Sequence, residues 1–263
     1  MSAPRGELDI TVYGRRAVLE ALECPTVEVA HVAFSGDVPG DIRRAIAQAC
    51  ERLGIEPQRL SPADIARLSG DPRNDQGVAA LIRLGTVTEP GAFLQSLTGR
   101  RAAEPARLIA LDGVTNPQNV GMIIRSSLAA GMAAMLWPTV GSPWVSGLVI
   151  KSSAATVYRC PIVRCQSLVE GLYEFKAAGF TLVGLDASSG VVESIFDHRP
   201  AHRAVYIVGS EAQGISAEVG ALLDARVAIP MAGGVESLNA AVAAALVCFL
   251  VSDGAAKRRS DAE

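Results

Sequence analysis

The second half of the chain alternates short apolar runs with amphipathic segments, a pattern typical of a sheet covered by helices. The apolar runs hardly alternate with polar residues, as expected of parallel strands that are buried on both faces. These predicted strands are 108–111, 133–137, 181–185, 205–208 and 226–229. Helical periodicity falls between them, at about 117–130, 146–155, 167–178, 216–223 and 237–252. The order predicts an α/β domain whose ligand lies at the loops that follow the carboxyl ends of the strands.

The first 85 residues follow a different rhythm, in which helices and strands are shorter. The predicted elements are a helix over 14–22, a strand over 27–34, a helix over 41–53, a short strand from Ile55, a helix capped by Ser61 and begun by Pro62, and a strand over 77–84. This order predicts a small three-layer α/β domain over 1–85. Residues 86–106 are rich in proline, glycine and arginine and are predicted to be a linker with a turn or two of helix. The main domain then covers 107–255 and a tail covers 256–263.

Composition narrows the class of protein. With 263 residues, 49% hydrophobic and 19% charged, the chain is neither disordered, nor collagen-like, nor a disulfide scaffold. A net charge of −3 excludes a polycation that holds nucleic acid by bulk attraction. The five scattered cysteines, without any C-x-x-C pair, indicate free thiols in a reducing cytoplasm and no metal site. The start of the chain lacks an apolar run and the stretch 240–251 is too short to span a membrane, so we expect a soluble cytoplasmic protein with no membrane partner.

Three loops after predicted strands carry candidate chemistry. In the first, Asn116 and Pro117 begin a helix on which Gln118, Gly121 and Arg125 share one stripe. Glycine is costly inside a helix, so Gly121 is expected to leave room beside the Arg125 guanidinium, a donor suited to phosphate. The alternative is an arginine held in a structural ion pair.

The other two loops combine glycines with polar side chains. Gly209 and Gly214 flank Glu211 and permit tight turns, which an ordinary βα turn also uses. The third loop, 227–239, contains a glycine pair followed by polar residues of which helix capping explains one. Neither loop is G-x-G-x-x-G, which argues against a dinucleotide-binding dehydrogenase.

Together these loops resemble the three motifs of the SpoU (TrmH-like) RNA 2′-O-ribose methyltransferases. The motifs are N-P-x-N-x-G-x-x-x-R, G-x-E-x-x-G and I-P-M-x-G-x-x-x-S-L-N, and the resemblance covers about 107–252. It implies an α/β parallel-sheet domain with a trefoil knot, S-adenosylmethionine as the cofactor, and a homodimer in which one subunit completes the other's site. It implies catalytic roles for Arg125, Asn119, Glu211, Ser237 and Asn239, and cofactor binding by Gly209, Ile229, Met231 and Leu238.

Arg125 matches the residue that activates the ribose hydroxyl in the family. Because arginine keeps its proton at any ordinary pH, our hypothesis is that Arg125 clamps the adjacent phosphate and stabilises the developing alkoxide. Asn119 and Asn239 are expected to orient Arg125 and the ribose, and Ser237 and Glu211 to shape the loops. In-line methyl transfer needs no metal, since alignment of the reactants supplies much of the rate.

The front domain resembles the RNA-recognition domain of the ribosomal-RNA branch, through Tyr13-Gly14 and Gln76-Gly77. This implies RNA binding by Arg15, Arg16 and Gln76. Residues 1–85 hold 10 arginines and 12 acidic residues, so RNA binding there depends on a local patch, for which Arg15, Arg16, Arg43 and Arg44 are candidates. The alternative for these arginines is a solvated helix face. Near the middle of the chain, Ala155 stands where the family usually has glycine.

The predicted function is S-adenosylmethionine-dependent 2′-O-ribose methylation of RNA, with 23S ribosomal RNA as the leading substrate. Three alternatives stay open at this point. They are a transfer-RNA methyltransferase of the same family, a catalytically silent RNA-binding or ribosome-assembly protein, and an unrelated nucleotide-binding α/β protein.

Overall fold

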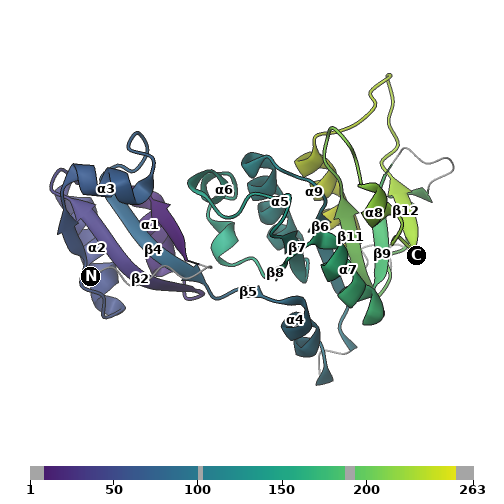
Figure 1. Cartoon of the computed structure of the whole chain (residues 1–263), viewed down its shortest axis with the longest axis horizontal. Helices are drawn as coiled ribbons and strands as arrows, with labels where there is room; N and C mark the ends of the chain where they lie inside the picture. The colour runs from purple at the N-terminus through teal and green to yellow at the C-terminus, as the bar shows by residue number, and fades with distance from the viewer. Residues whose placement is uncertain (1–8, 100–102, 187–192, 253–263) are drawn as a thin grey trace, which may run out of the picture. The chain divides into compact units, whose positions relative to one another are not determined.

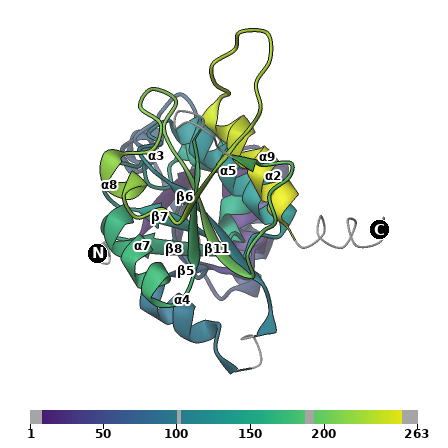
Figure 2. The ribbon, with the colours of Figure 1, turned by 90° about the vertical axis from the view of Figure 1, so that its right-hand side faces the viewer.

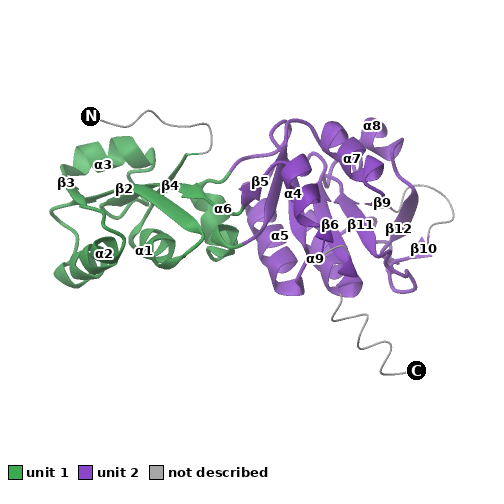
Figure 3. Ribbon diagram, turned by 90° about the horizontal axis from the view of Figure 1, so that it is seen from below, with its two compact units in different colours: residues 1–86, 145–159 green, residues 87–144, 160–263 purple. Residues whose placement is uncertain are grey.

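The computed structural model describes residues 9–99, 103–186 and 193–252. The chain forms two compact units (Figure 3). Unit 1 comprises residues 1–86 and 145–159, and unit 2 comprises residues 87–144 and 160–263. A short segment from the middle of the sequence therefore belongs with the front of the chain, which the sequence pattern did not predict.

Unit 1 is built on a four-stranded sheet in the order β1-β4-β2-β3. The strands are β1 (Ile10–Tyr13), β2 (Val27–Ser35), β3 (Gln58–Leu60) and β4 (Val78–Leu84). Helices α1 (Arg15–Glu23) and α2 (Gly40–Arg52) lie on one face and α3 (Pro62–Ser69) on the other (Figure 3). The predicted three-layer arrangement is confirmed, and β1 is a strand that the analysis missed because four residues leading into a helix carry little alternation.

Hydrogen bonds in unit 1 tie the segment 145–159 to α1 and to the residue that precedes β2. It contains helix α6 (Gly147–Ser152) and a 3-10 turn, η2 (Thr156–Tyr158). The Tyr158 hydroxyl donates to the Ala17 carbonyl (3.2 Å), and Thr26 Oγ1 donates to the Tyr158 carbonyl (2.6 Å). These contacts join residues more than 130 positions apart, so local periodicity does not contain them.

Helix α6 ends earlier than the predicted 146–155 because its last turn reverses. The Ala155 N–H donates to the Ile150 carbonyl (2.9 Å), closing a Schellman-type cap. Ala154 and Ala155 take φ values of 49° and 57°, in the left-handed region that favours glycine. Ala155 is thus an alanine in a conformation for which the glycine usual in the family is better suited.

Unit 2 contains an eight-stranded sheet, parallel throughout its described residues, in the order β10-β12-β9-β11-β6-β7-β8-β5. Figure 1 shows this order from β12 to β5. Five strands were predicted: β6 (Ala106–Leu111), β7 (Ala134–Pro138), β9 (Thr181–Leu185), β11 (Arg203–Val208) and β12 (Ala225–Ala228). Three strands were missed because they are short or interrupted by polar residues: β5 (Val87–Thr88), β8 (Ile162–Cys165) and β10 (Glu193–Ser194). The predicted linker thus contains a strand, and also helix α4 (Pro90–Ser96).

Helices cover both faces of this sheet, as the apolar runs predicted. Helices α4, α7 (Leu168–Ala177) and α8 (Ala217–Gly220) lie on one face, and α5 (Pro117–Ala130) and α9 (Ala240–Val251) on the other (Figure 2). Along β6, Leu108 and Ala110 join the core beneath α4 and α7, and the alternate residues Ile109 and Leu111 are buried as completely. The carboxyl ends of these parallel strands therefore share one edge, where their loops meet.

Candidate active site

Three loops that are far apart in the sequence meet at the carboxylate of Glu211. Its Oε1 atom accepts hydrogen bonds from Asn119 Nδ2 (2.9 Å), Asn239 Nδ2 (2.5 Å) and the Ala240 backbone N–H (3.1 Å). Asn119 follows β6, Glu211 follows β11, and Asn239 follows β12. The predicted convergence of the three motifs is therefore present in the fold of a single chain.

Helix caps determine where the two asparagines of this cluster lie. Asn116 Oδ1 accepts from the Gln118 N–H (2.9 Å) and begins α5, which places Asn119 in the first turn, where it is buried. Asn239 is the N-cap of α9, because its Oδ1 accepts from the N–H groups of Ala241 and Val242. The predicted helix 237–252 therefore begins only at Ala240.

The side-chain amides of Asn119 and Asn239 form hydrogen bonds with each other and with Glu211. Asn239 Nδ2 also donates to Asn119 Oδ1 (3.1 Å), so each amide contacts both the other amide and Glu211. The carboxylate lies against the N-terminus of α9, where the helix dipole favours a negative charge. The two asparagines thus hold Glu211, and within the described residues they form no hydrogen bond with Arg125.

The loop after β11 is a closed turn that depends on glycine. Ser210 and Gly214 exchange backbone hydrogen bonds of 2.9 and 3.1 Å. A Cβ atom added to Gly209 would lie 2.1–2.5 Å from backbone atoms of Gly214 and Ile215, so no larger residue fits there. The Ser216 N–H donates to Asp112 Oδ2 (2.6 Å), which ties this turn to the loop after β6.

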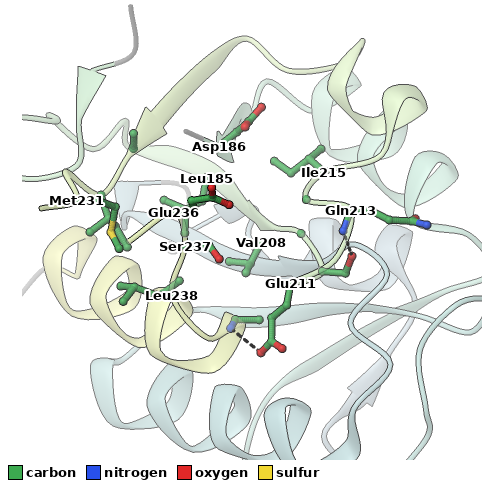
Figure 4. A pocket seen from close by; sticks show the side chains of 17 residues that line it. Leu185, Asp186, Val208, Glu211, Gln213, Ile215, Met231, Glu236, Ser237 and Leu238 are labelled. Carbon is green, nitrogen blue, oxygen red and sulfur yellow. Dashed lines mark hydrogen bonds between the residues drawn. The ribbon is translucent and has the colours of Figure 1, made fainter. Parts of the chain in front are cut away.

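A cavity of about 470 Å³ opens beside Glu211, within the size range of small-ligand sites (Figure 4). It lies at the carboxyl ends of β9, β11 and β12, where the sequence analysis placed the ligand. Six predicted site residues line it: Gly209, Ile229, Met231, Leu238, Glu211 and Ser237. The cavity is also lined by Glu236 of the third loop and by three residues that the sequence analysis missed: Leu185, Asp186 and Gln213.

Asp186 is the most informative of the missed residues. It directly follows β9, and its side chain is only 15% exposed. An ion pair with Arg226 Nη1 holds the carboxylate, while Arg226 Nη2 donates to the Gly220 carbonyl (3.2 Å). Its place at the end of a predicted strand, on the edge where the loops meet, was the signal in the sequence.

Arg125 lies elsewhere on α5. It follows Asn119 by six residues, which turns its side chain about 240° around the helix from the buried amide. Arg125 is exposed and does not line the cavity. Within the described residues Arg125 forms no ion pair, which disfavours the structural alternative. Gly121 is buried on α5, whereas Arg125 is exposed.

The residues predicted to bind RNA lie together in unit 1. Gln76 Oε1 accepts from the Arg15 backbone N–H (3.1 Å), and Arg15 Nε donates to the Gln76 carbonyl (3.2 Å). Arg16 is exposed and forms an ion pair with Glu20 (2.9 Å). The four arginines of the predicted patch come from two helices, Arg15 and Arg16 from α1, and Arg43 and Arg44 from α2.

Comparison with known families identifies the class. Residues 106–249 match the model of the SpoU rRNA methylase family, and residues 11–85 match the model of the RNA 2′-O ribose methyltransferase substrate-binding domain. The chain is therefore an RNA methyltransferase in class, and it belongs to the SpoU family. The two matches fall on the two regions that the sequence rhythm separates.

Relatives extend the likeness over nearly the whole chain. A protein of Mycobacterium avium (strain 104), named an uncharacterized tRNA/rRNA methyltransferase, is 33% identical over 251 residues, or 95% of this chain and 79% of that protein. The SpoU methyltransferase AviRb from Streptomyces viridochromogenes, solved with AdoMet, has a TM-score of 0.73 at 24% identity and covers 96% of this chain and 91% of its own. An AdoMet-bound rRNA methyltransferase from Sinorhizobium meliloti has a TM-score of 0.72 at 21% identity, covering 93% and 87%. These two structures show the same fold.

Two further findings concern the described residues 9–99, 103–186 and 193–252. None of their helices combines the length and the apolar character that crossing a bilayer requires. They also contain no cluster of three histidine, cysteine or acidic side chains arranged to hold a metal ion.

Proposed function

We propose that this protein transfers a methyl group from S-adenosylmethionine to a ribose 2′-hydroxyl of ribosomal RNA. The observation that carries the proposal is the meeting of Asn119, Glu211 and Asn239 beside a cavity lined by the predicted cofactor-binding residues. Membership of the SpoU family and the AdoMet complexes of the two solved neighbours support it. The trefoil knot implied by the resemblance stays a prediction.

The cavity fits the proposed cofactor. Ile229, Met231 and Leu238 offer apolar surface for an adenine ring, and Gly209 leaves the backbone open at the edge of the cavity. The Asp186 carboxylate, held by Arg226, suits the hydroxyl groups of a ribose, and Glu236 brings negative charge that suits a sulfonium. When bound, S-adenosylmethionine supplies an activated methyl group, so the remaining tasks of the chain are alignment and stabilisation of the ribose oxygen.

We further propose that the enzyme works as a homodimer through α5 and α9. Met122, Val242 and Phe249 are large apolar residues that are 40–50% exposed. Val242 and Phe249 are seven residues apart and lie on one stripe of α9, while Met122 and Arg125 are three apart on α5. A partner packed on this face would bring the Arg125 of one subunit toward the cavity of the other, which fits its absence from its own cavity.

In this arrangement Arg125 clamps the phosphate next to the target ribose and stabilises the alkoxide as the hydroxyl proton leaves. A guanidinium offers a fork of donors to phosphate and keeps its charge throughout the reaction. Glu211 shapes the loop, since its Oε1 is committed to three donors, and Ser237 is available at the cavity wall. The match of 106–249 to the SpoU rRNA methylase model supports ribosomal RNA as the substrate, with transfer RNA as the alternative.

The test is a methyl-transfer assay that also shows where on the nucleotide the methyl group is attached. The full chain is incubated with methyl-labelled S-adenosylmethionine and either 23S ribosomal RNA or bulk transfer RNA, and the products are hydrolysed in alkali. A 2′-O-methyl group blocks cleavage at its nucleotide, so label in alkali-resistant dinucleotides from ribosomal RNA supports the proposal. Label only in transfer RNA favours the alternative substrate. Label in mononucleotides, or no transfer by a chain that binds the cofactor, contradicts it.

A further inference from the structure

A second cavity lies in unit 1 and shares no lining residue with the first. Its volume is about 640 Å³, and it is lined both by residues of the front domain and by the segment 147–155. The polar lining residues are Tyr13, Arg16, Glu20, Asp71, Asn74, Gln76 and Lys151. Two of these, Arg16 and Gln76, belong to the set that the resemblance marks for RNA, and the proposed methyl transfer gives the cavity no role.

At this cavity, each of two side-chain amides uses one of its two polar groups in a hydrogen bond within the protein. Asn74 Nδ2 donates to Asp71 Oδ2 (2.8 Å), and Gln76 Oε1 accepts from the Arg15 N–H (3.1 Å). The remaining polar groups are the side-chain carbonyl oxygen of Asn74, which can accept a hydrogen bond, and the amino group of Gln76, which can donate one. Within the described residues, neither of these two groups has a hydrogen-bond partner in the protein. The cavity therefore presents an acceptor and a donor whose amides are already oriented.

Asp71 keeps this arrangement in place. It accepts from Asn74 and also from the Tyr13 hydroxyl (3.2 Å). The hydrogen bond from Asn74 is the largest cause that lowers the pKa of Asp71, with further support from Tyr13, so this carboxylate stays ionised at neutral pH. Tyr13 in turn packs against Gly147, where an added Cβ would lie 2.5 Å from its hydroxyl oxygen.

The charges and walls of the cavity favour a particular kind of ligand. Arg16 and Lys151 are opposed by Glu20 and Asp71, so the cavity has no net charge with which to attract a polyanion. Ala17, Leu148 and Ile150 provide apolar surface of the sort that covers the flat face of a ring. A nucleobase combines such a face with an edge of hydrogen-bond donors and acceptors, and unpaired bases of RNA are recognised in this way.

We propose that this cavity holds one unstacked nucleotide of the substrate RNA, distinct from the methylated one, with its base edge at Asn74 and Gln76 and its phosphate at Lys151. The inference rests on the proposed function for its ligand, RNA. Lys151 lies in the range of the methyltransferase family model, whereas Asn74 and Gln76 lie in that of the substrate-binding model. All three residues belong to unit 1, so such a nucleotide would contact two segments of that unit that are far apart in the sequence.

The test measures binding of RNA by the full chain. Fluorescence anisotropy is recorded with a short labelled oligoadenylate, single-stranded or paired with oligouridylate, over a range of salt concentrations. The variants are Asn74→Leu, which keeps the size and removes the amide, and Lys151→Ala. Gln48→Ala and Arg52→Ala are the matched controls, because these residues are exposed on α2 and do not line the cavity. Thermal melts confirm that each variant is folded.

The wild-type chain is expected to bind the single strand more tightly than the duplex. Asn74→Leu should weaken single-strand binding roughly fivefold, as loss of one hydrogen bond does, and leave duplex binding unchanged. Lys151→Ala should reduce the slope of log affinity against log salt by about 1. Each control should differ from the wild type less than its matched variant does.

Failure of this proposal is distinguishable from failure of the proposed function. If the wild type transfers methyl groups to RNA but Asn74→Leu and Lys151→Ala bind the single strand like their controls, the cavity proposal is wrong and the function stands. No single-strand binding by the wild type also overturns the cavity proposal. If the two variants lose binding as expected but no methyl transfer occurs, the nucleotide site stands and the proposed enzyme activity is wrong.

Discussion

The contact between Asn119 and Glu211 should be measurable as a coupling energy. Asn119→Ala removes one donor from the carboxylate, and Glu211→Ala removes the acceptor of three bonds. Hydrogen bonds to charged groups contribute about 1.5–3 kcal/mol. Asn119 is only 5% exposed, so we expect Asn119→Ala to lower the free energy of unfolding by about 2 kcal/mol. Glu211 is exposed and water replaces part of its bonds, so Glu211→Ala should cost about 2–3 kcal/mol rather than the sum of three full bonds.

The double variant loses the shared bond once. Its loss of stability should therefore be smaller than the sum of the single losses by about 1 kcal/mol or more. Urea unfolding followed by tryptophan fluorescence measures this directly, because both tryptophans, Trp137 and Trp144, lie in unit 2. The control pairs Asn119→Ala with Asp224→Ala, since Asp224 bonds Leu182 and Lys176 outside the cluster.

Whether the two single losses of stability add up in the double variant tests the contact. If the Asn119 and Glu211 variants add to within about 0.3 kcal/mol, as distant sites do, the two loops are not in contact and the site described here is wrong. If the control pair shows the same coupling, the effect is a general property of unit 2 and does not support the specific contact.

The remaining predictions concern catalysis, a strained backbone position and acid stability. Arg125→Ala should lower the rate of methyl transfer about a hundredfold and leave cofactor affinity unchanged. Arg125→Lys should keep part of the rate, because lysine keeps the positive charge. A lysine variant as inactive as the alanine variant would contradict a role through charge. Ala154→Gly should raise stability by up to about 1 kcal/mol, because Ala154 is exposed and has a φ of 49°, and a loss of stability in urea would show that the cap is not strained. Burial tends to raise the pKa of Asp224, but the Leu182 N–H and the Lys176 ammonium outweigh it and lower the pKa below its ordinary value of 3.8. The stability that depends on this carboxylate is present above that value and is lost as the pH falls through the lowered pKa. Asp224→Asn should therefore flatten the acid side of the stability–pH curve, and an unchanged acid limb would refute the assignment.

Much of the fold could be predicted from local pattern, for a physical reason. The predicted strand 108–111 is apolar at every position and all four residues are buried, and that pattern requires cover on both faces of the sheet. Strand β1 has four residues, too few for the same signal to emerge. The place of 145–159 in unit 1 depends on bonds such as that from Tyr158 to Ala17, which no local pattern contains.

The candidate site, too, was predictable from the sequence only in part. The motifs predicted that Asn119, Glu211 and Asn239 belong to one site, but not that the carboxylate would accept from both amides. Asp186 was missed because it stands outside the motifs, although it follows a predicted strand. The orientation of Arg125 away from Glu211 follows from helix geometry once the structure shows which face of α5 is buried.

The central claim is that the loops after β11 and β12 form one cofactor pocket that is tied to α5 through Glu211. Amide hydrogen exchange of the full chain, with and without saturating S-adenosylmethionine, tests it most directly. The account predicts slower exchange in 209–215 and 229–240, with a smaller effect near Asn119. Protection confined to other segments, or unchanged exchange at saturating cofactor, would contradict it.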